Sequence, residues 1–496
     1  MARLSFSRAV SRLAEREPGR VVVTAEDGVL TAAALDARAT ALARAYVGLG
    51  VRPDDLVTVA LPSSAEALAV CCAVWRAGAT PQPLDPTTSP QQLADVVALA
   101  RPTLVVGRDP GHGAGRAVGG AGSGGSSLPP WVPPGWSPTD ADVREVPTTL
   151  PDRWATSWKA PTSSGSTGRP SVVVSTAPAL VEPEVPSAPF LPLRATQLVV
   201  APITGSAAFT YAVRGLLTGH HLVLLPTGPS VGGGRPDPRV VLDALVRHHV
   251  SWTWVSPAVL GDLVRLPAAE RAAADLSALE RLVHLGARCD PEVKRAAIAW
   301  LGPERVVEVY AGSESTGLFV ADGQEWLARP GSVGRGVGGT EVRVTRADGS
   351  PAAAGEVGEV WMRRPGGPAY RYLGRESRRD GDGWDTLGDL GHLDADGHLF
   401  LLDRAGDVHV RDGVPVAPAD VEHVLERHPG VRGAAVRWEE GEGPPRLVAV
   451  VELTDGAPSD VSTWCTQHLP APARPDVVEV ATAPVRSTTG KVRRHS

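Results

Sequence analysis

Thr-Ser-Ser-Gly-Ser-Thr-Gly-Arg-Pro occupies residues 162–170, between Trp158-Lys159-Ala160 and the apolar run Val172-Val173-Val174. The glycines let the backbone turn tightly and approach a ligand closely. Backbone N–H groups and Ser or Thr hydroxyls in such a run can donate to phosphate oxygens. The run is not a Walker loop, because no Gly-Lys-Ser/Thr closes it. A flexible Gly/Ser linker has the same composition, so the rest of the chain must distinguish a phosphate-binding loop from a linker.

Three further motifs follow along the chain. They are Tyr310-Ala311-Gly312-Ser313-Glu314, then Asp385-Thr386-Leu387-Gly388-Asp389 with Asp403-Arg404, and finally Arg-Ser-Thr-Thr-Gly-Lys-Val-Arg-Arg at residues 486–494. Together with the first run, this ordered set resembles the motifs of the adenylate-forming enzyme superfamily, which includes acyl- and aryl-CoA synthetases, adenylation domains of peptide synthetases and luciferases. The resemblance covers nearly the whole chain. Segments 284–289 and 300–305 resemble bile-acid-CoA-ligase-like members most closely.

Hydrophobic periodicity predicts an α/β fold. Helical patterns alternate with short apolar strand patterns, which favours βαβ units and parallel sheets. The helical patterns are at Ala32–Leu49, Ala65–Ala77 and Arg239–His248, and the strand patterns are at 56–61, 104–106, 222–225 and 252–255. From about Val333 the period changes to two, which predicts a small antiparallel barrel.

The resemblance implies two domains. A large N-terminal domain, residues 1–402, is expected to hold two βα subdomains and the antiparallel barrel. A small, mobile α+β C-terminal domain, residues 403–496, is expected to turn on a hinge near 403–407. Residues 107–140 are dominated by Gly, Ser and Pro, so a flexible insertion is predicted there.

Composition argues against several kinds of partner. The chain has 496 residues, 43% of them hydrophobic and 21% charged, as in a soluble globular protein. The net charge is −6 and no basic block occurs, so neither nucleic acid nor a membrane surface is expected as a partner. The four cysteines have no metal-ligand spacing and are expected to be reduced thiols of a cytoplasmic protein. Nothing in the sequence indicates an oligomeric state.

Lysine is scarce in this chain. Of 49 basic residues, only Lys159, Lys294 and Lys491 are lysines, so arginine fills the other 46 positions. A lysine that remains can be needed for its compact point charge and three donors, which the planar guanidinium does not reproduce. This observation adds weight to Lys491 independently of the motif that contains it. The sequence suggests no role for Lys159 or Lys294.

The resemblance implies attack of a carboxylate on the α-phosphate of ATP, with release of pyrophosphate. Ser164 to Gly168 would hold the β- and γ-phosphates, Ser313 the α-phosphate, and Glu314 a Mg²⁺ ion. Tyr310 would stack on adenine, Asp389 would accept from the ribose hydroxyls, and Arg404 would contact ribose or phosphate. Lys491 would bridge the carboxylate and the α-phosphate. The expected nucleotide-binding residues are Ser163, Ser164, Gly165, Ser166, Thr167, Gly168, Gly286, Ala287, Arg288, Tyr310, Ala311, Gly312, Asp389 and Arg404, and the expected catalytic residues are Ser313, Glu314, Arg404 and Lys491.

The acid pocket and the acceptor are less closely defined. The pocket is expected to include Thr204, Gly205, Ser206, Phe209 and Val255. The chain departs from the family pattern at Ser171, Gly205, Gly406 and Asp412, and Asp412 stands where CoA ligases line the pantetheine tunnel with glycine. The chain is therefore interpreted as an AMP-forming acid ligase of secondary metabolism, with transfer to CoA or another acceptor.

Two other functions stay open at this point. One is a CoA-independent adenylating enzyme, such as an ATP-dependent diazotase that activates nitrite for an aromatic amine in natural-product biosynthesis. The other is a non-catalytic nucleotide-binding homologue. The presence of both Glu314 and Lys491 argues against the last reading.

Overall fold

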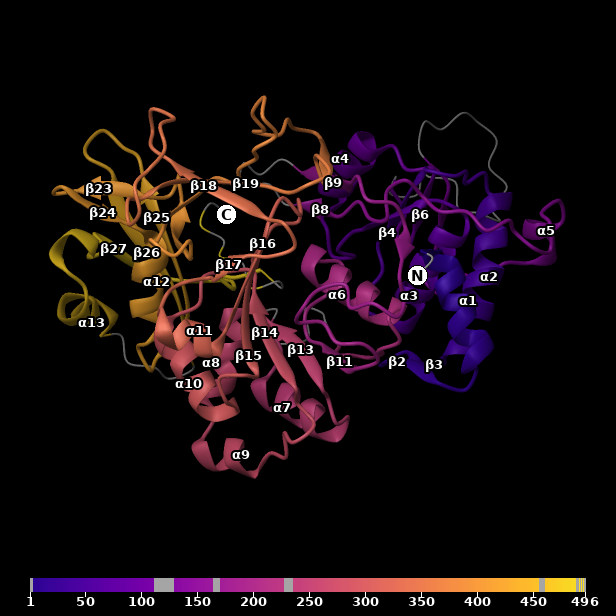
Figure 1. Ribbon diagram of the computed structural model, residues 1–496, viewed down its shortest axis with the longest axis horizontal. Coiled ribbons are helices and arrows are strands. Elements are labelled where there is room, and N and C mark those ends of the chain that lie inside the picture. The colour runs from indigo at the N-terminus through magenta and orange to yellow at the C-terminus, as the bar shows by residue number, and fades with distance from the viewer. Residues whose placement is uncertain are drawn as a thin grey trace.

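The computed structural model describes residues 3–110, 129–163, 170–226, 235–454, 460–487, 490, 492 and 494. Within these residues the chain forms the predicted α/β architecture, with a large N-terminal body and a smaller C-terminal part. Figure 1 shows α1–α3 with β4 and β6 at one end of the molecule and α12, α13 and β25–β27 at the other. Their bounds are α1 Phe6–Arg16, α2 Ala32–Gly48, α3 Ala65–Arg76, β4 Leu56–Val59, β6 Leu104–Val106, α12 Pro418–Glu426, α13 Val461–His468, β25 Val431–Glu439, β26 Arg446–Leu453 and β27 Val477–Val480.

The largest sheet has nine strands in the order β17-β16-β15-β14-β13-β11-β12-β2-β3. Its central strands run parallel, and antiparallel strands complete both edges. The strands are β2 Val21–Ala25, β3 Gly28–Thr31, β11 Thr196–Val199, β12 His221–Leu224, β13 Trp252–Val255, β14 Arg281–Leu285, β15 Val306–Ala311, β16 Leu318–Asp322 and β17 Arg335–Gly336. Parallel strands need helical crossovers, and the helices that follow β11, β12, β13 and β14 are α6 Ser206–Leu217, α7 Pro238–Arg247, α8 Pro257–Arg265 with α9 Ala268–Ala273, and α10 Pro291–Leu301.

A second, parallel sheet has the order β5-β4-β6-β7. The strands not yet given are β5 Thr80–Pro83 and β7 Trp131–Val132, and the nearby helices are α4 Pro90–Ala100 and α5 Asp140–Val143. β7 lies in the segment that was expected to be flexible. The described end of that segment therefore contributes a strand, because Val132 is buried and pairs with Val106. The Gly/Ser-rich residues 111–128 lie outside the described part of the chain.

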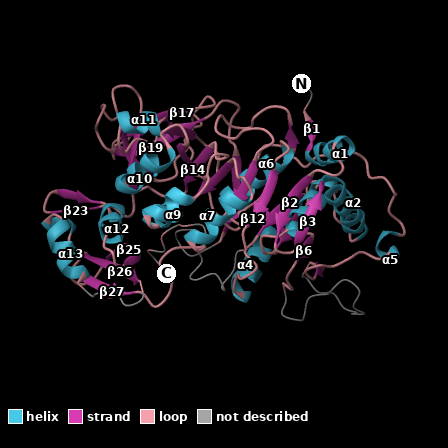
Figure 2. Cartoon of the chain, turned by 90° about the horizontal axis from the view of Figure 1, so that it is seen from below, coloured by secondary structure: helices cyan, strands magenta, loops and turns pink. Residues whose placement is uncertain are grey.

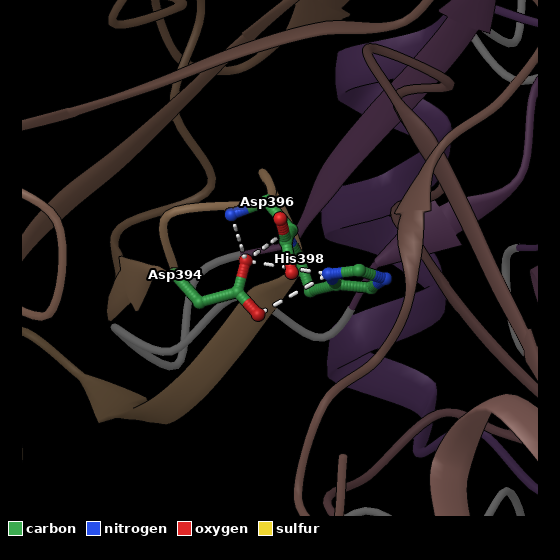
Figure 3. A group of neighbouring side chains, drawn as sticks. All are labelled: Asp394, Asp396 and His398. Atoms are coloured by element: carbon green, nitrogen blue, oxygen red, sulfur yellow. Dashed lines mark hydrogen bonds and ion pairs between the residues drawn. The ribbon is translucent and has the colours of Figure 1, made fainter. Parts of the chain in front are cut away.

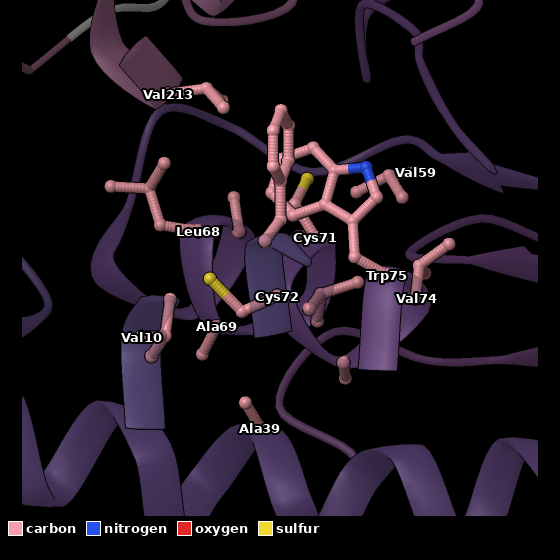
Figure 4. Close-up of a cluster of buried hydrophobic side chains, with 14 of the residues drawn as sticks. Val10, Ala39, Val59, Leu68, Ala69, Cys71, Cys72, Val74, Trp75 and Val213 are labelled. Carbon is pink, nitrogen blue, oxygen red and sulfur yellow. The ribbon is translucent and has the colours of Figure 1, made fainter. Parts of the chain in front are cut away.

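Helices α1, α2 and α3 pack together with α6 around the largest hydrophobic cluster (Figure 4). Trp75 on α3 contacts Phe6 edge-on, with ring centroids 5.1 Å apart. Cys71 and Cys72 are buried in this cluster, and all four cysteines of the chain are free and buried. Burial raises the pKa of both Cys71 and Cys72, as expected for inert packing thiols.

Two antiparallel sheets complete the N-terminal body. One has the order β18-β19-β21-β22, with β18 Glu341–Thr345, β19 Gly358–Arg363, β21 Asp389–Leu393 and β22 Leu399–Arg404. This is the region that was predicted to be a small barrel. Its strand order leaves β18 and β22 at the edges, so the described strands form an open sheet. The other sheet has the order β20-β9-β8, with β8 Thr162–Ser163, β9 Ser171–Ser175 and β20 Tyr370–Leu373. Short elements β1 Leu4–Ser5, β10 Leu180–Val181 and α11 Gly323–Ala328 lie outside these sheets.

The C-terminal part has a hydrophobic core of its own. Sheet β25-β26-β27 packs against α12, and the buried side chains include Val421, Leu425, Val436 and Leu447. Before it comes the hairpin β23 His409–Arg411 and β24 Val414–Val416. Figure 2 shows α12, α13 and these strands grouped apart from the helices around β2 and β12. No helix among the described residues is long and apolar enough to cross a membrane.

Candidate functional site

Predicted site residues from distant parts of the sequence meet at one edge of the nine-stranded sheet. Thr204 and Gly205 follow β11, Val255 ends β13, Gly286 follows β14, and Tyr310 is the second-last residue of β15. The strands β11, β13, β14 and β15 are parallel neighbours, so these positions all lie at their carboxyl ends. Open α/β sheets bind their ligands at this edge. The placement therefore agrees with a ligand site built from loops after these strands.

Tyr310, Asp389 and Arg404 form one hydrogen-bonded unit. The Tyr310 hydroxyl donates to Asp389 Oδ2 over 2.5 Å, and Arg404 Nε lies 3.0 Å from Asp389 Oδ1. β21 begins at Asp389 and β22 ends at Arg404, and the two residues are register partners. Burial, and then the charge of Asp389, raise the pKa of Tyr310 well above its ordinary value. The phenol therefore stays protonated and remains a donor near neutral pH.

Glu314 is buried in the loop after β15. Its Oε1 accepts a hydrogen bond from the Tyr372 hydroxyl at 2.5 Å and lies 3.4 Å from the Arg375 guanidinium. Its Oε2 has no hydrogen-bond partner among the residues that the structure describes. A carboxylate oxygen is a normal Mg²⁺ ligand beside phosphate oxygens, so Oε2 of Glu314 fits the role expected of it. Ser313 is half-buried beside it.

Tyr372 and Arg375 were not identified from the sequence. Tyr372 lies on β20, which pairs with β9, and β9 pairs in turn with β8. β8 and β9 flank the Gly-rich run, so Tyr372 links the neighbourhood of that run to Glu314. Residues 164–169, which include Ser164, Gly165, Ser166, Thr167 and Gly168, lie outside the described residues, and of Ser163 only the backbone is described. The signal for Tyr372 was its strand pattern, Tyr370-Arg371-Tyr372-Leu373, next to a Gly-Pro turn.

The predicted acid pocket is placed only in part as expected. Gly205 is the N-cap of α6 and Ser206 is its first residue. Phe209 on the same helix is buried and packs against the rings of Trp75 and Trp158, with centroid distances of 6.1 and 6.2 Å. Its side chain thus belongs to the hydrophobic core in this structure. Val255 borders a small pocket that also includes Val200, Ala201 and Ser256.

The C-terminal part contacts this edge of the sheet. Gly490 packs so closely on Ser256, the N-cap of α8, that a Cβ added to it would lie 2.5 Å from Ser256 Cβ. The next residue, Lys491, lies outside the described residues. Arg288, predicted to bind nucleotide, donates instead to Asp420 Oδ1 on α12 at 2.6 Å and to the carbonyl of Leu402 at 3.2 Å. Gly286 and Ala287 lie in the same loop.

Arg494 connects the end of the chain to the predicted hinge. Its Nη1 lies 2.9 Å from Asp403 Oδ1 and 2.5 Å from Asp407 Oδ2, and its other nitrogens donate to both oxygens of Glu422. These carboxylates raise the pKa of Arg494 against the effect of burial. Arg494 belongs to the C-terminal motif at residues 486–494, but the sequence predicted no role for it.

Asp394, Asp396 and His398 form a further cluster of polar side chains (Figure 3). Asp394 Oδ1 accepts from the backbone N–H groups of Asp396 and His398 at 2.9 and 2.8 Å. Arg329 pairs with both aspartates, and Glu325 lies 3.1 Å from the imidazole. Arg329 offsets part of the negative charge, and the backbone contacts shape the turn between β21 and β22, so we interpret the cluster as structural.

Comparison with known proteins agrees with this geometry. A family model described as "AMP-binding enzyme" matches residues 10–373, and one described as "AMP-binding enzyme C-terminal domain" matches residues 420–491. A sulfoacetate–CoA ligase from Cupriavidus necator is 27% identical over 486 residues, which cover 94% of this chain and 91% of that protein. A mutant of the amide bond synthetase McbA from Marinactinospora thermotolerans has a TM-score of 0.78 and 26% identity, covering 98% of this chain and 97% of that one. The anthranilate CoA ligase AuaEII, solved with anthranoyl-AMP, shares the fold with a TM-score of 0.79 at 20% identity, covering 99% of this chain and 96% of that one.

Proposed function

This chain belongs to the family of AMP-binding enzymes, an AMP-forming ligase family, and from that premise we propose that it activates a carboxylic acid with ATP. An oxygen of the acid attacks the α-phosphorus, the bond to the β-phosphate oxygen breaks, and pyrophosphate leaves. The product is an acyl-adenylate. The acyl group then passes to CoA or to another acceptor, in secondary metabolism.

One observation carries this proposal: Tyr310, Asp389 and Arg404 form a connected unit beside Glu314. These residues are separated by up to 94 positions, and the fold brings them together from β15, β21 and β22. A hydroxyl, a carboxylate and a guanidinium in contact can recognise the hydroxyls and phosphate of a nucleotide. The buried carboxylate next to them can bind the Mg²⁺ ion that accompanies nucleotide phosphates.

The bound nucleotide would bring Mg²⁺ with it, and Glu314 Oε2 would hold that ion. The ion would neutralise negative charge on the phosphates. Tyr372 and Arg375 keep the Glu314 carboxylate in place by binding its other oxygen. Ser313 is proposed to donate to the α-phosphate and Lys491 to bring the two anions together, because positioned cations lower the cost of their approach.

The acceptor is the least constrained part of the proposal. The similar proteins include a CoA ligase and an amide bond synthetase. Asp412 lies at φ 52° in the exposed turn between β23 and β24, followed by Gly413. A carboxylate at this position would repel a phosphorylated acceptor, so we include amines as well as CoA among the acceptors to be tested.

A pyrophosphate-release screen tests the proposal. The purified protein would be supplied with ATP, Mg²⁺ and a panel of carboxylic acids, each with CoA, with an amine, or with neither. Acid-dependent pyrophosphate release is expected, and it should be lost in Glu314→Gln. Parallel wells with nitrite and an aromatic amine test the diazotase alternative. A protein that binds ATP but releases no pyrophosphate with any acid or with nitrite would be a non-catalytic homologue, and the proposal would be wrong.

A further inference from the structure

Lys159 is a buried cation that has no carboxylate partner in the described structure. Only 4% of its surface is exposed. Its Nζ donates to Thr210 Oγ1 at 2.8 Å and lies 3.5 Å from Ser206 Oγ. Lys294, by contrast, is a buried lysine whose Nζ lies 2.5 Å from Glu308 Oε2. Lys294 is thus explained by its ion pair, whereas Lys159 faces neutral hydroxyls.

A second cation stands beside it. Arg214 lies one turn beyond Thr210 on α6, and its Cζ is 5.5 Å from the centre of the Trp158 ring. Lys159 Nζ is 4.9 Å from the same centre. Arg214 has no ion pair with any carboxylate in the part of the chain that the structure describes. Isolated buried charge is costly. A buried Lys159 and a half-buried Arg214 against one aromatic ring therefore favour an anion beside them when the site is filled.

Lys159 is directed at the first turn of α6. That helix has 12 residues, its N-cap is Gly205, and no side chain caps its first amides. Unpaired first-turn N–H groups and the helix dipole attract negative charge. Ser206 is also one of the residues expected in the acid pocket. The buried ammonium therefore lies beside the Ser206 hydroxyl and the uncapped amides, next to a residue expected in the acid pocket.

We propose that Lys159 and Ser206 bind a second acidic group of the substrate, so that the preferred acids are dianions with a carboxylate or sulfonate besides the reacting carboxylate. This inference rests on the proposed function. The reacting carboxylate is a poorer occupant for this site, because it loses its charge when the acyl-adenylate forms and would leave Lys159 unpaired. A second acidic group keeps its charge throughout the reaction.

The electrostatics agree with an anion at this place. Burial, and then the charge of Arg214, lower the pKa of Lys159 to about 7, while the charge of Glu314 raises it. A bound anion would restore the charged form of the amine. In the complex the ammonium would be fully protonated, and its hydrogen bond to the anion would be charge-assisted.

The test compares acids that differ only in a terminal group: succinate with butyrate, glutarate with valerate, and adipate with hexanoate. Pyrophosphate release gives kcat and KM for each acid with the wild type, Lys159→Met, Lys159→Arg and Ser206→Ala. Arg247→Met, which removes an exposed charge on α7, is the matched control. The wild type is expected to prefer at least one diacid over its partner, and Lys159→Met should reduce this preference by about tenfold or more through KM. Lys159→Arg should keep part of it.

Other outcomes decide against the inference. If the wild type uses monoacids as well as or better than diacids, or if Lys159→Met keeps the diacid preference, the assignment is wrong. A rise in the KM for ATP with no change in the KM for acids would assign the cation to the phosphates instead. If Lys159→Met does not fold, the diacid preference of Ser206→Ala decides in its place. Failure of every acid with the wild type would overturn the proposed function itself, which is a different result from acid activation without diacid preference.

Discussion

Tyr310 and Asp389 share a hydrogen bond of 2.5 Å, and Arg404 Nε holds the second oxygen of the same carboxylate at 3.0 Å. Both oxygens of Asp389 therefore have protein partners before any nucleotide arrives. A carboxylate offers about four acceptor sites, so the ribose hydroxyls can share it with these partners. The two contacts fix the direction in which the remaining lone pairs point.

Asp389→Ala is expected to raise the KM for ATP by about 10- to 100-fold, the worth of one or two hydrogen bonds to a charged group. Removal of a ribose hydroxyl from ATP provides the second change of a double-mutant cycle with Asp389→Ala. The wild type should lose affinity for 2′-deoxy-ATP or 3′-deoxy-ATP relative to ATP, whereas Asp389→Ala should bind ATP and the deoxy analogues almost equally. Calorimetric titration of each nucleotide measures this.

Asp396→Ala is the matched control, since it removes an exposed carboxylate paired with Arg329 near the end of β21. It should leave all three nucleotide affinities unchanged. Equal discrimination between ATP and its deoxy analogues in the wild type and in Asp389→Ala would show that Asp389 does not read the ribose.

Arg494→Ala is expected to destabilise the C-terminal part. Arg494 pairs with Asp403, Asp407 and Glu422, and its removal would leave Glu422, with a side chain only 3% exposed, without its guanidinium partner. Breaking a buried ion pair from one side costs about 3–5 kcal/mol. Scanning calorimetry should show a lower Tm, and limited proteolysis should cut faster near 403–407. Arg446→Ala, at an exposed pair in the same part of the chain, should change neither measurement.

Lys159→Met is expected to stabilise the ligand-free protein. The pKa of Lys159 is about 7 in the folded state against 10.5 as its ordinary value. Between these values the unfolded chain binds more protons, so the stability of the wild type should rise with pH across this range. The stability advantage of Lys159→Met should therefore be greatest near pH 7 and should shrink toward pH 10. Denaturant unfolding of both proteins at a series of pH values measures the difference, and a wild type that is more stable than the variant at pH 7 would contradict it.

Motif order predicted which residues of the candidate site lie close together. The carboxyl ends of the parallel strands gather Gly205, Val255, Gly286 and Tyr310 as the βα pattern indicates, since every loop that follows such a strand leaves at the same edge. The short motifs also contain Asp389 and Arg404 at a spacing that lets them meet, because the two residues occupy the paired ends of one hairpin.

Contacts set by long-range pairing were not predictable in this way. Tyr372 reaches Glu314 only because β20 pairs with β9, nearly 200 positions earlier in the chain. Trp131 and Val132 form β7 although Gly, Ser and Pro surround them, since parallel pairing with β6 overrides a local composition typical of loops. Phe209 was predicted to line the acid pocket but faces the core, because it packs against the rings of Trp75 and Trp158, which come from distant parts of the sequence.

Gly490 packs on Ser256 next to the carboxyl end of β13, and Lys491, which follows it in the sequence, lies outside the described residues. Lys491→Ala is expected to slow adenylate formation by roughly 10²-fold or more, because a cation between two approaching anions is worth most at the transition state. The Tm should change little, since a lysine in a terminal segment contributes little to the fold. Acid-dependent pyrophosphate release and scanning calorimetry measure the two quantities.

Two further measurements separate the charge of Lys491 from its shape and from the second step. Lys491→Arg should also be poor, because the guanidinium is planar and longer and would misplace its charge. A chemically prepared acyl-adenylate should still be consumed by Lys491→Ala in the presence of its acceptor, because the α-phosphate has already been attacked and the C-terminal part is proposed to turn away at its hinge. Wild-type adenylation by Lys491→Ala, or full activity of Lys491→Arg, would remove this lysine from the proposed mechanism.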